Sequence, residues 1–291
     1  MRAPKNEAPW NLSRDKLTHP RAENDTLMDI YAFSQAEFLS FILTLVRVSL
    51  LIFLMPFFGG DNLPTMGKAL ICIIVTLTIW PRLALQMPDL EPHPLTLILL
   101  LVSELILGLT LALCVHFVFA AIQTGGDFIG FQMGLTMVSI MDPASGARVS
   151  VTSQILYMVS MLIFLSFNGH LHLLRALMDS FAYIPPGGIL VTPPLIGTIL
   201  TMSANMFVVA IKIAAPVMVA LLMVELALAL MGRAAPQMNL MTMGFPIKIS
   251  VGFFFLGLLF TIMAGHIEEF IVHIEPMFQN LLRLASPNPP L

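Results

Sequence analysis

Charged residues are scarce in this sequence, and their scarcity excludes an ordinary soluble domain. Of the 291 residues, 11% are charged and 57% are hydrophobic, and the mean hydropathy is +0.89. Soluble globular domains carry about 25% charged residues. A chain with so few polar side chains could not cover its surface in water, whereas a lipid bilayer accommodates apolar side chains. The composition therefore predicts an integral membrane protein.

The sequence also lacks the short motifs that carry enzyme chemistry. It has no Gly-x-x-x-x-Gly-Lys-Ser/Thr phosphate loop, no Gly-x-Ser-x-Gly elbow and no Cys-x-x-Cys pair. Its two cysteines, Cys72 and Cys114, lie inside apolar runs and are interpreted as small buried side chains. A net charge of −3 without a basic stripe argues against nucleic acid as a partner. We therefore expect neither an enzyme nor a cofactor.

One group of residues has a spacing that could suit a metal ion. His266, Glu269 and His273 stand at positions i, i+3 and i+7, so they share one face of a helix. Their order is not the His-Glu-x-x-His of zinc-binding helices. We interpret the segment as a helix leaving the membrane and predict no metal site.

Six apolar runs predict an all-α, polytopic membrane protein. About 20 residues, rising ~1.5 Å each, cross the hydrocarbon core of a bilayer. Clusters of proline and glycine separate the runs, so six crossings are expected. The runs lie near residues 38–58, 67–87, 95–122, 150–170, 204–232 and 249–274.

Three parts are expected along the chain. Residues 1–27 combine mixed charge with low hydrophobicity and predict a disordered polar extension, with the native start at Met28 or the extension specific to a lineage. The first apolar run lacks a small-residue cleavage site and contains Arg47, so we do not expect a cleaved signal peptide. Residues 28–278 form the membrane domain, and 279–291 form a short proline-rich tail.

Residues 125–141 do not fit a simple crossing. Gly126, Gly130 and Gly134 recur at four-residue spacing, which puts them on one helix face that another backbone can approach closely. Together with Gly125 they weaken the helix, at roughly 1 kcal/mol each. Asp127 would also be costly against lipid. We predict a bent, re-entrant or pore-side element, although a plain helix-packing motif would explain the glycines equally well.

A few charges stand within apolar runs and should face protein or water rather than lipid. Glu104 has no obvious partner in the sequence, and Glu225 and Arg233 are too far apart to pair along one helix. Two interpretations remain open for the group, namely ion pairs between helices or subunits, and a proton or substrate path. The candidates are Arg47, Glu104, Asp127, Glu225 and Arg233, with Lys212 as a further charge of this kind.

Seven short blocks occur in the order typical of one family of membrane proteins. They are Leu-Val-Arg-Val at 45–48, Phe-Ala-Ala-Ile-Gln-Thr-Gly-Gly-Asp-Phe-Ile-Gly-Phe-Gln-Met-Gly-Leu at 119–135, Met-Asp-Pro-Ala-Ser at 141–145, Asn-Gly-His-Leu at 168–171, Ser-Phe-x-x-Ile-Pro-Pro-Gly at 180–187, Ala-Pro-Gln-Met-Asn at 235–239 and Gly-Phe-Pro-Ile-Lys at 244–248. On these blocks the chain resembles the FliR and T-component family of type III export gates, over residues 30–275.

The resemblance implies a subunit that joins FliP and FliQ, with FlhB and FlhA nearby, in the flagellar basal body of the bacterial inner membrane. Such a gate passes unfolded rod, hook and filament subunits, and its helices form steep hairpins. The family's central loop, which helps to close the pore, matches residues 125–141, where Asp127 replaces the Glu common in members. We accordingly assign Phe128, Phe131, Met133 and Met137 to the closure, and Asp142, Pro143, Ala144 and Ser145 to the turn that follows it.

Other functions stay open as alternatives. The injectisome T component shares the Ala-Pro-Gln and Pro-Ile-Lys blocks, although Phe-Asn-Gly-His and Gly-Phe-Pro favour the flagellar branch. A small-solute secondary transporter would show paired broken helices in two repeated halves, and only one such element is found.

Overall fold

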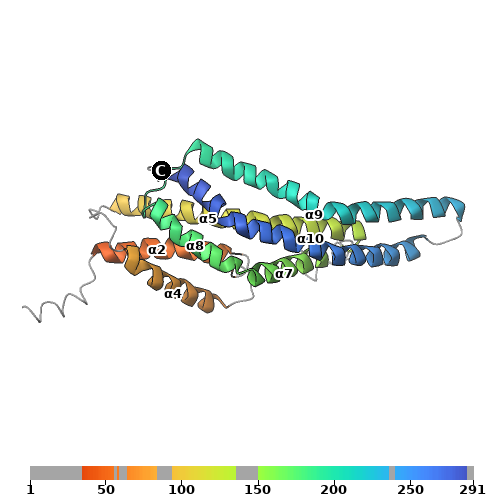
Figure 1. The fold of residues 1–291 in the computed structure, drawn as a ribbon, viewed down its shortest axis with the longest axis horizontal. Coiled ribbons are helices and arrows are strands. Elements are labelled where there is room, and N and C mark those ends of the chain that lie inside the picture. The colour runs from red at the N-terminus through yellow and green to blue at the C-terminus, as the bar shows by residue number, and fades with distance from the viewer. Residues whose placement is uncertain are drawn as a thin grey trace, which may run out of the picture.

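The computed structural model describes residues 35–55, 58, 64–83, 94–135, 150–235 and 240–286, and all its regular elements there are α-helices (Figure 1). The six apolar runs fall in these helices, so the predicted all-α fold is confirmed. Residues 1–27 lie outside the described residues. The helices are α2 (Gln35–Leu54), α4 (Thr65–Leu83), α5 (Pro94–Met133), α7 (Val151–Ser166), α8 (Gly169–Tyr183), α9 (Pro193–Ala234) and α10 (Leu240–Ala285).

Helix α5 is the centre of an elongated bundle. It contacts α2, α7, α9 and α10, and Figure 1 shows α2 and α4 on one side of it and α9 on the other. Its buried side chains include Leu107, Leu111, Val115 and Phe119, all at most 3% exposed. A helix with apolar residues on every face is typical of such a surrounded position.

Fewer than six of the described helices are long and apolar enough to cross a membrane. Helices α2, α5, α9 and α10 are, and the bent pair α7–α8 makes a fifth candidate if counted as one. Helix α4 falls short because its apolar part covers only Thr65–Pro81. Residues 125–133 also add no separate element, because α5 continues without a break to Met133.

The three longest helices exceed the thickness of a membrane. Helices α5, α9 and α10 have 40, 42 and 46 residues. At ~1.5 Å per residue they are about 60–70 Å long, roughly twice the ~30 Å hydrocarbon core. They must therefore tilt steeply or continue beyond the lipid.

Helices α9 and α10 lie side by side, and their joined ends extend beyond α5 (Figure 1). At the other end of the pair, the Thr192 hydroxyl accepts from the amide of Leu195 and donates to the carbonyl of Leu284 at 2.9 Å. The amide of Leu190 donates to the carbonyl of Ala285. Helix α10 runs through Ala285, so residues 279–285 of the expected tail are helical.

Candidate functional site

The glycines at the end of α5 pack against neighbouring backbone. A Cβ atom added at Gly126 would lie 2.5 Å from the Cα of Ser153 in α7, and one at Gly125 would lie 3.0 Å from the carbonyl oxygen of Ala210 in α9. A Cβ at Gly130 would collide with the hydroxyl of Ser150. These glycines therefore let α5 approach α7 and α9 closely, as the helix-packing interpretation requires.

The bend expected from Gly125 onward begins later, at Gly134. Helix α5 is regular through Met133, because tight packing on two sides stabilises it in spite of its glycines. Gly134 has φ of +82°, a conformation that favours glycine. A Cβ there would lie 2.6 Å from the Phe245 ring. The prediction of a bend or re-entrant turn is thus wrong for residues 125–133, whereas a pore-side position stays a prediction, and the chain turns at Gly134.

The four residues assigned to the closure occupy different environments within this chain. Phe131 is 67% exposed, Phe128 is half-buried against the core, and Met133 is fully buried. A Cβ at Gly252 would lie 2.7 Å from Met133, so α10 makes room for this side chain. Met137 and the turn residues Asp142, Pro143, Ala144 and Ser145 lie outside the described residues. Phe131 is therefore the candidate that this chain leaves free to meet another chain.

Two polar side chains flank Phe131 on the last turns of α5. Asp127 is exposed, and no hydrogen bond or ion pair holds its carboxylate among the residues that the structure describes. The amide nitrogen of Gln132 donates to the carbonyl of Met218 in α9 at 3.2 Å, which ties the end of α5 to α9. Sequence reasoning gave Gln132 no role, since its acceptor is a backbone atom 86 residues away.

Glu104 has the partner that the sequence did not reveal. Its carboxylate accepts hydrogen bonds from Nε of Arg47 at 2.6 Å and from Nη2 at 2.9 Å, and both side chains are at most 1% exposed. The amide of Gly187 donates to the same carboxylate at 2.7 Å. For this pair the structure favours an ion pair between helices, here α2 and α5, over a proton path.

The Nη1 group of Arg47 makes two further hydrogen bonds. Its Nη1 donates to the Ser180 hydroxyl at 3.3 Å and to the carbonyl of Ile184 at 3.1 Å, and its guanidinium lies 4.1 Å from the centre of the Phe181 ring. The group therefore joins α2, α5, α8 and the segment after α8. Bidentate, fully hydrogen-bonded geometry is what a buried charge pair needs to offset its desolvation.

The two other candidate charges separate in space. Glu225 of α9 pairs with Lys248 of α10 at 2.5 Å, and both side chains are partly exposed. Arg233 is exposed near the end of α9 and does not pair with Glu225. Lys248 closes a block quoted from the sequence, yet nothing in its spacing indicated Glu225 as its partner.

Neither catalytic nor metal-binding geometry is found in the described part of the chain. His266 lies 3.9 Å from Glu269, and both are exposed. No group of three His, Cys, Asp or Glu side chains in the described ranges could hold a metal ion. The interactions found among the described residues are therefore packing contacts and ion pairs, and some charged side chains lie exposed on otherwise apolar helices.

Comparison with known proteins identifies the family of this chain. Residues 38–274 match the family described as bacterial export proteins, family 1. The chain belongs to this family. Flagellar biosynthetic protein FliR of Escherichia coli K12 is 31% identical over 238 residues, covering 82% of this chain and 90% of the relative. FliR of Bacillus subtilis 168 is 33% identical over 263 residues, covering 86% and 96%.

A relative named for translocation is also similar to this export protein. Yop proteins translocation protein T of Yersinia pestis is 28% identical over 204 residues, covering 69% of this chain and 77% of the relative. The flagellar and Yop relatives together identify a type III export component. Its apolar helices make it a membrane-embedded one.

Proposed function

We propose that this export protein is a core subunit of the flagellar type III export gate in the bacterial inner membrane, within the flagellar basal body. It assembles with FliP and FliQ into a channel for unfolded flagellar rod, hook and filament proteins, next to FlhB and FlhA. It acts by packing and gating and not as an enzyme.

The observation that carries this proposal is the exposed end of α5. Phe131 is 67% exposed and Asp127 lacks a partner among the described residues, on a helix whose other side is tightly packed. An exposed carboxylate is costly against lipid, by about 2.5–3.5 kcal/mol at mid-membrane. This face is therefore expected to meet water or another chain, as the wall of a conduit does.

The long helices α9 and α10 support assembly with other chains. In their most apolar stretches, only 28% of the residues of α9 and 22% of those of α10 are buried inside this chain. Both helices exceed one membrane thickness, so the parts that continue beyond the lipid need another cover for their apolar faces. Neighbouring apolar helices would cover the rest.

Purification of the affinity-tagged chain from its native membranes tests the proposal. We expect FliP-like and FliQ-like chains to co-elute in a defined ratio. Recovery of the chain alone or as a homo-oligomer would favour a transporter, and recovery with virulence-type secretion chains would favour the injectisome alternative. Both results contradict the proposal.

A further inference from the structure

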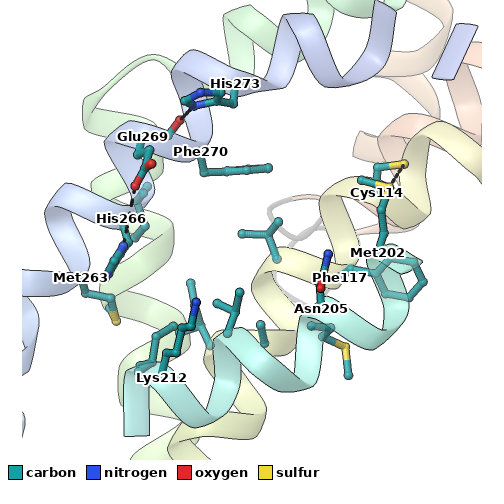
Figure 2. Close-up of a pocket in the computed structure, with 17 residues that line it drawn as sticks. Cys114, Phe117, Met202, Asn205, Lys212, Met263, His266, Glu269, Phe270 and His273 are labelled. Carbon is teal, nitrogen blue, oxygen red and sulfur yellow. Dashed lines mark hydrogen bonds and ion pairs between the residues drawn. The ribbon is translucent and has the colours of Figure 1, made fainter. Parts of the chain in front are cut away.

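A cavity of about 510 Å³ lies between α5, α9 and α10 (Figure 2). Cys114, Phe117 and Ile122 of α5 form one wall, and Met202 and Met206 of α9 form another. Phe270 of α10 faces them. The walls are apolar, which suits a hydrocarbon ligand.

Helix α9, which borders the cavity, is fastened to its neighbours at two points. At the start of α9, Leu195 is buried and the Thr192 hydroxyl donates to the carbonyl of Leu284. Further along, Ala210 is fully buried and its carbonyl approaches Gly125 of α5. Met202, Asn205, Met206 and Val209 line the cavity between these two points, and Lys212 and Ile213 line it just beyond Ala210.

Opposite charges line the cavity without pairing. Lys212 comes from α9 and Glu269 from α10, and Figure 2 shows them on the two helices that border the space. No ion pair joins them in the described structure, and the carboxylate of Glu269 makes only a long contact of 3.9 Å with His266 there. The amide of Asn205 also lines the cavity. A ligand that carries both a negative and a positive group would satisfy both charges.

These polar groups stand near the middle of two long helices. On α9, residues 193–211 carry no charge before Lys212, and on α10, residues 249–265 carry none before His266. Each helix is roughly twice as long as the hydrocarbon core is thick. If one half of each helix crosses the lipid and the other half continues beyond it, a residue near the middle falls close to a membrane boundary. Phospholipid headgroups lie at this level.

We infer that the cavity binds one zwitterionic phospholipid of the ethanolamine type, with an acyl chain among the apolar walls, its phosphate at Lys212 and its ammonium at Glu269. A helix from another chain fits less well. One turn of a helix with its side chains fills roughly 500 Å³, from a diameter of 10–12 Å and a pitch of 5.4 Å. The cavity would hold only one such turn, whereas a flexible acyl chain is far thinner.

Native mass spectrometry of the export complex tests the inference, after purification in mixed phosphatidylethanolamine and phosphatidylglycerol. We expect the complex to retain phosphatidylethanolamine in preference to phosphatidylglycerol. Lys212→Met should lower its retention about tenfold, as expected for one lost charge-assisted hydrogen bond. Glu269→Gln should remove the preference between the two lipids, because the ammonium loses its partner.

Matched variants separate the cavity from general surface effects. Val209→Phe adds bulk to a cavity residue and should abolish retention, whereas Val208→Phe alters its neighbour outside the lining and should not. Glu268→Gln is the corresponding control for Glu269, because Glu268 does not line the cavity.

Three results would overturn the inference. The first is equal retention of both lipids by the unaltered complex. The second is lipid retention that Val209→Phe leaves unchanged while the variant keeps the thermal stability of the parent. The third is a photocrosslinker at Asn205 that captures a protein chain in native membranes instead of lipid.

Discussion

At the scale of single residues, the ion pair between Arg47 and Glu104 shows how an apolar bundle accommodates charge. Both side chains are almost fully buried, and hydrogen bonds from Gly187 and to Ser180 and Ile184 complete the group. Burying two charges costs several kcal/mol per ion, so the pair stabilises the fold only while its hydrogen bonds are complete. Loss of one partner leaves a bare charge among apolar side chains.

Glu104→Gln should therefore destabilise the protein strongly, by about 3–5 kcal/mol. Unfolding by SDS in mixed detergent micelles measures the free energy of unfolding. Glu225→Gln is the control, because its pair with Lys248 is partly exposed and such pairs contribute about 0–1 kcal/mol. Equal losses in the two variants would contradict this assignment of a buried structural pair.

The effect of adding a side chain at a glycine depends on the neighbours of that glycine. Gly126→Ala places a Cβ against the backbone of Ser153, so it should lower the free energy of unfolding, as overpacking typically does by about 1–3 kcal/mol. Gly197→Ala in α9 meets nothing within 4 Å and should raise it by roughly 0.5–1 kcal/mol through helix propensity. The same SDS titration measures both. Two changes of the same sign would show that the approach of α5 to α7 is not tight.

At the scale of elements, the 70° bend between α7 and α8 depends on the conformation of one residue. Asn168 has φ of 56°, and Gly169 follows where a side chain would collide with the Phe164 ring. Asparagine tolerates left-handed backbone better than most residues, and β-branched residues tolerate it poorly. The bend directs α8 toward α10, where His172 contacts Glu275 at 3.0 Å.

Asn168→Val should cost about 1–2 kcal/mol, because a β-branched residue is strained in this conformation. Asn168→Gly should be close to neutral, since glycine adopts positive φ freely. Thermal unfolding in detergent, followed by helical circular dichroism, distinguishes the two. If valine were tolerated as well as glycine, the bend would not depend on this backbone angle.

At the scale of the whole molecule, the proposed gate assembly would cover the exposed end of α5 and the long helices α9 and α10. Phe131 lies near Asp127, which has no partner among the described residues, on the side of α5 left open by α7 and α9. Apolar side chains close a conduit by excluding water and ions. Phe131 is thus the residue at which assembly and closure can be separated.

Phe131→Ala should leave the fold of this chain intact, because the side chain is 67% exposed in it, but should let ions leak through the resting gate. Conductance of the reconstituted complex in planar bilayers measures the leak. Phe207→Ala is the control, since Phe207 is 52% exposed and belongs to α9 instead of α5. A tight gate in the Phe131 variant would contradict its role in closure.

The sequence alone determined the helical, membrane-embedded class and, through its motif blocks, the family, and it offered close packing as one of two interpretations of the glycines. The class follows from composition and run length, and glycine spacing depends on residues near one another in the chain. Only the tertiary structure decided that Glu104 pairs with Arg47, that Glu225 pairs with Lys248, and that α5 turns at Gly134 rather than at Gly125. Such outcomes depend on contacts between helices far apart in the sequence, where packing and pairing outweigh local propensity.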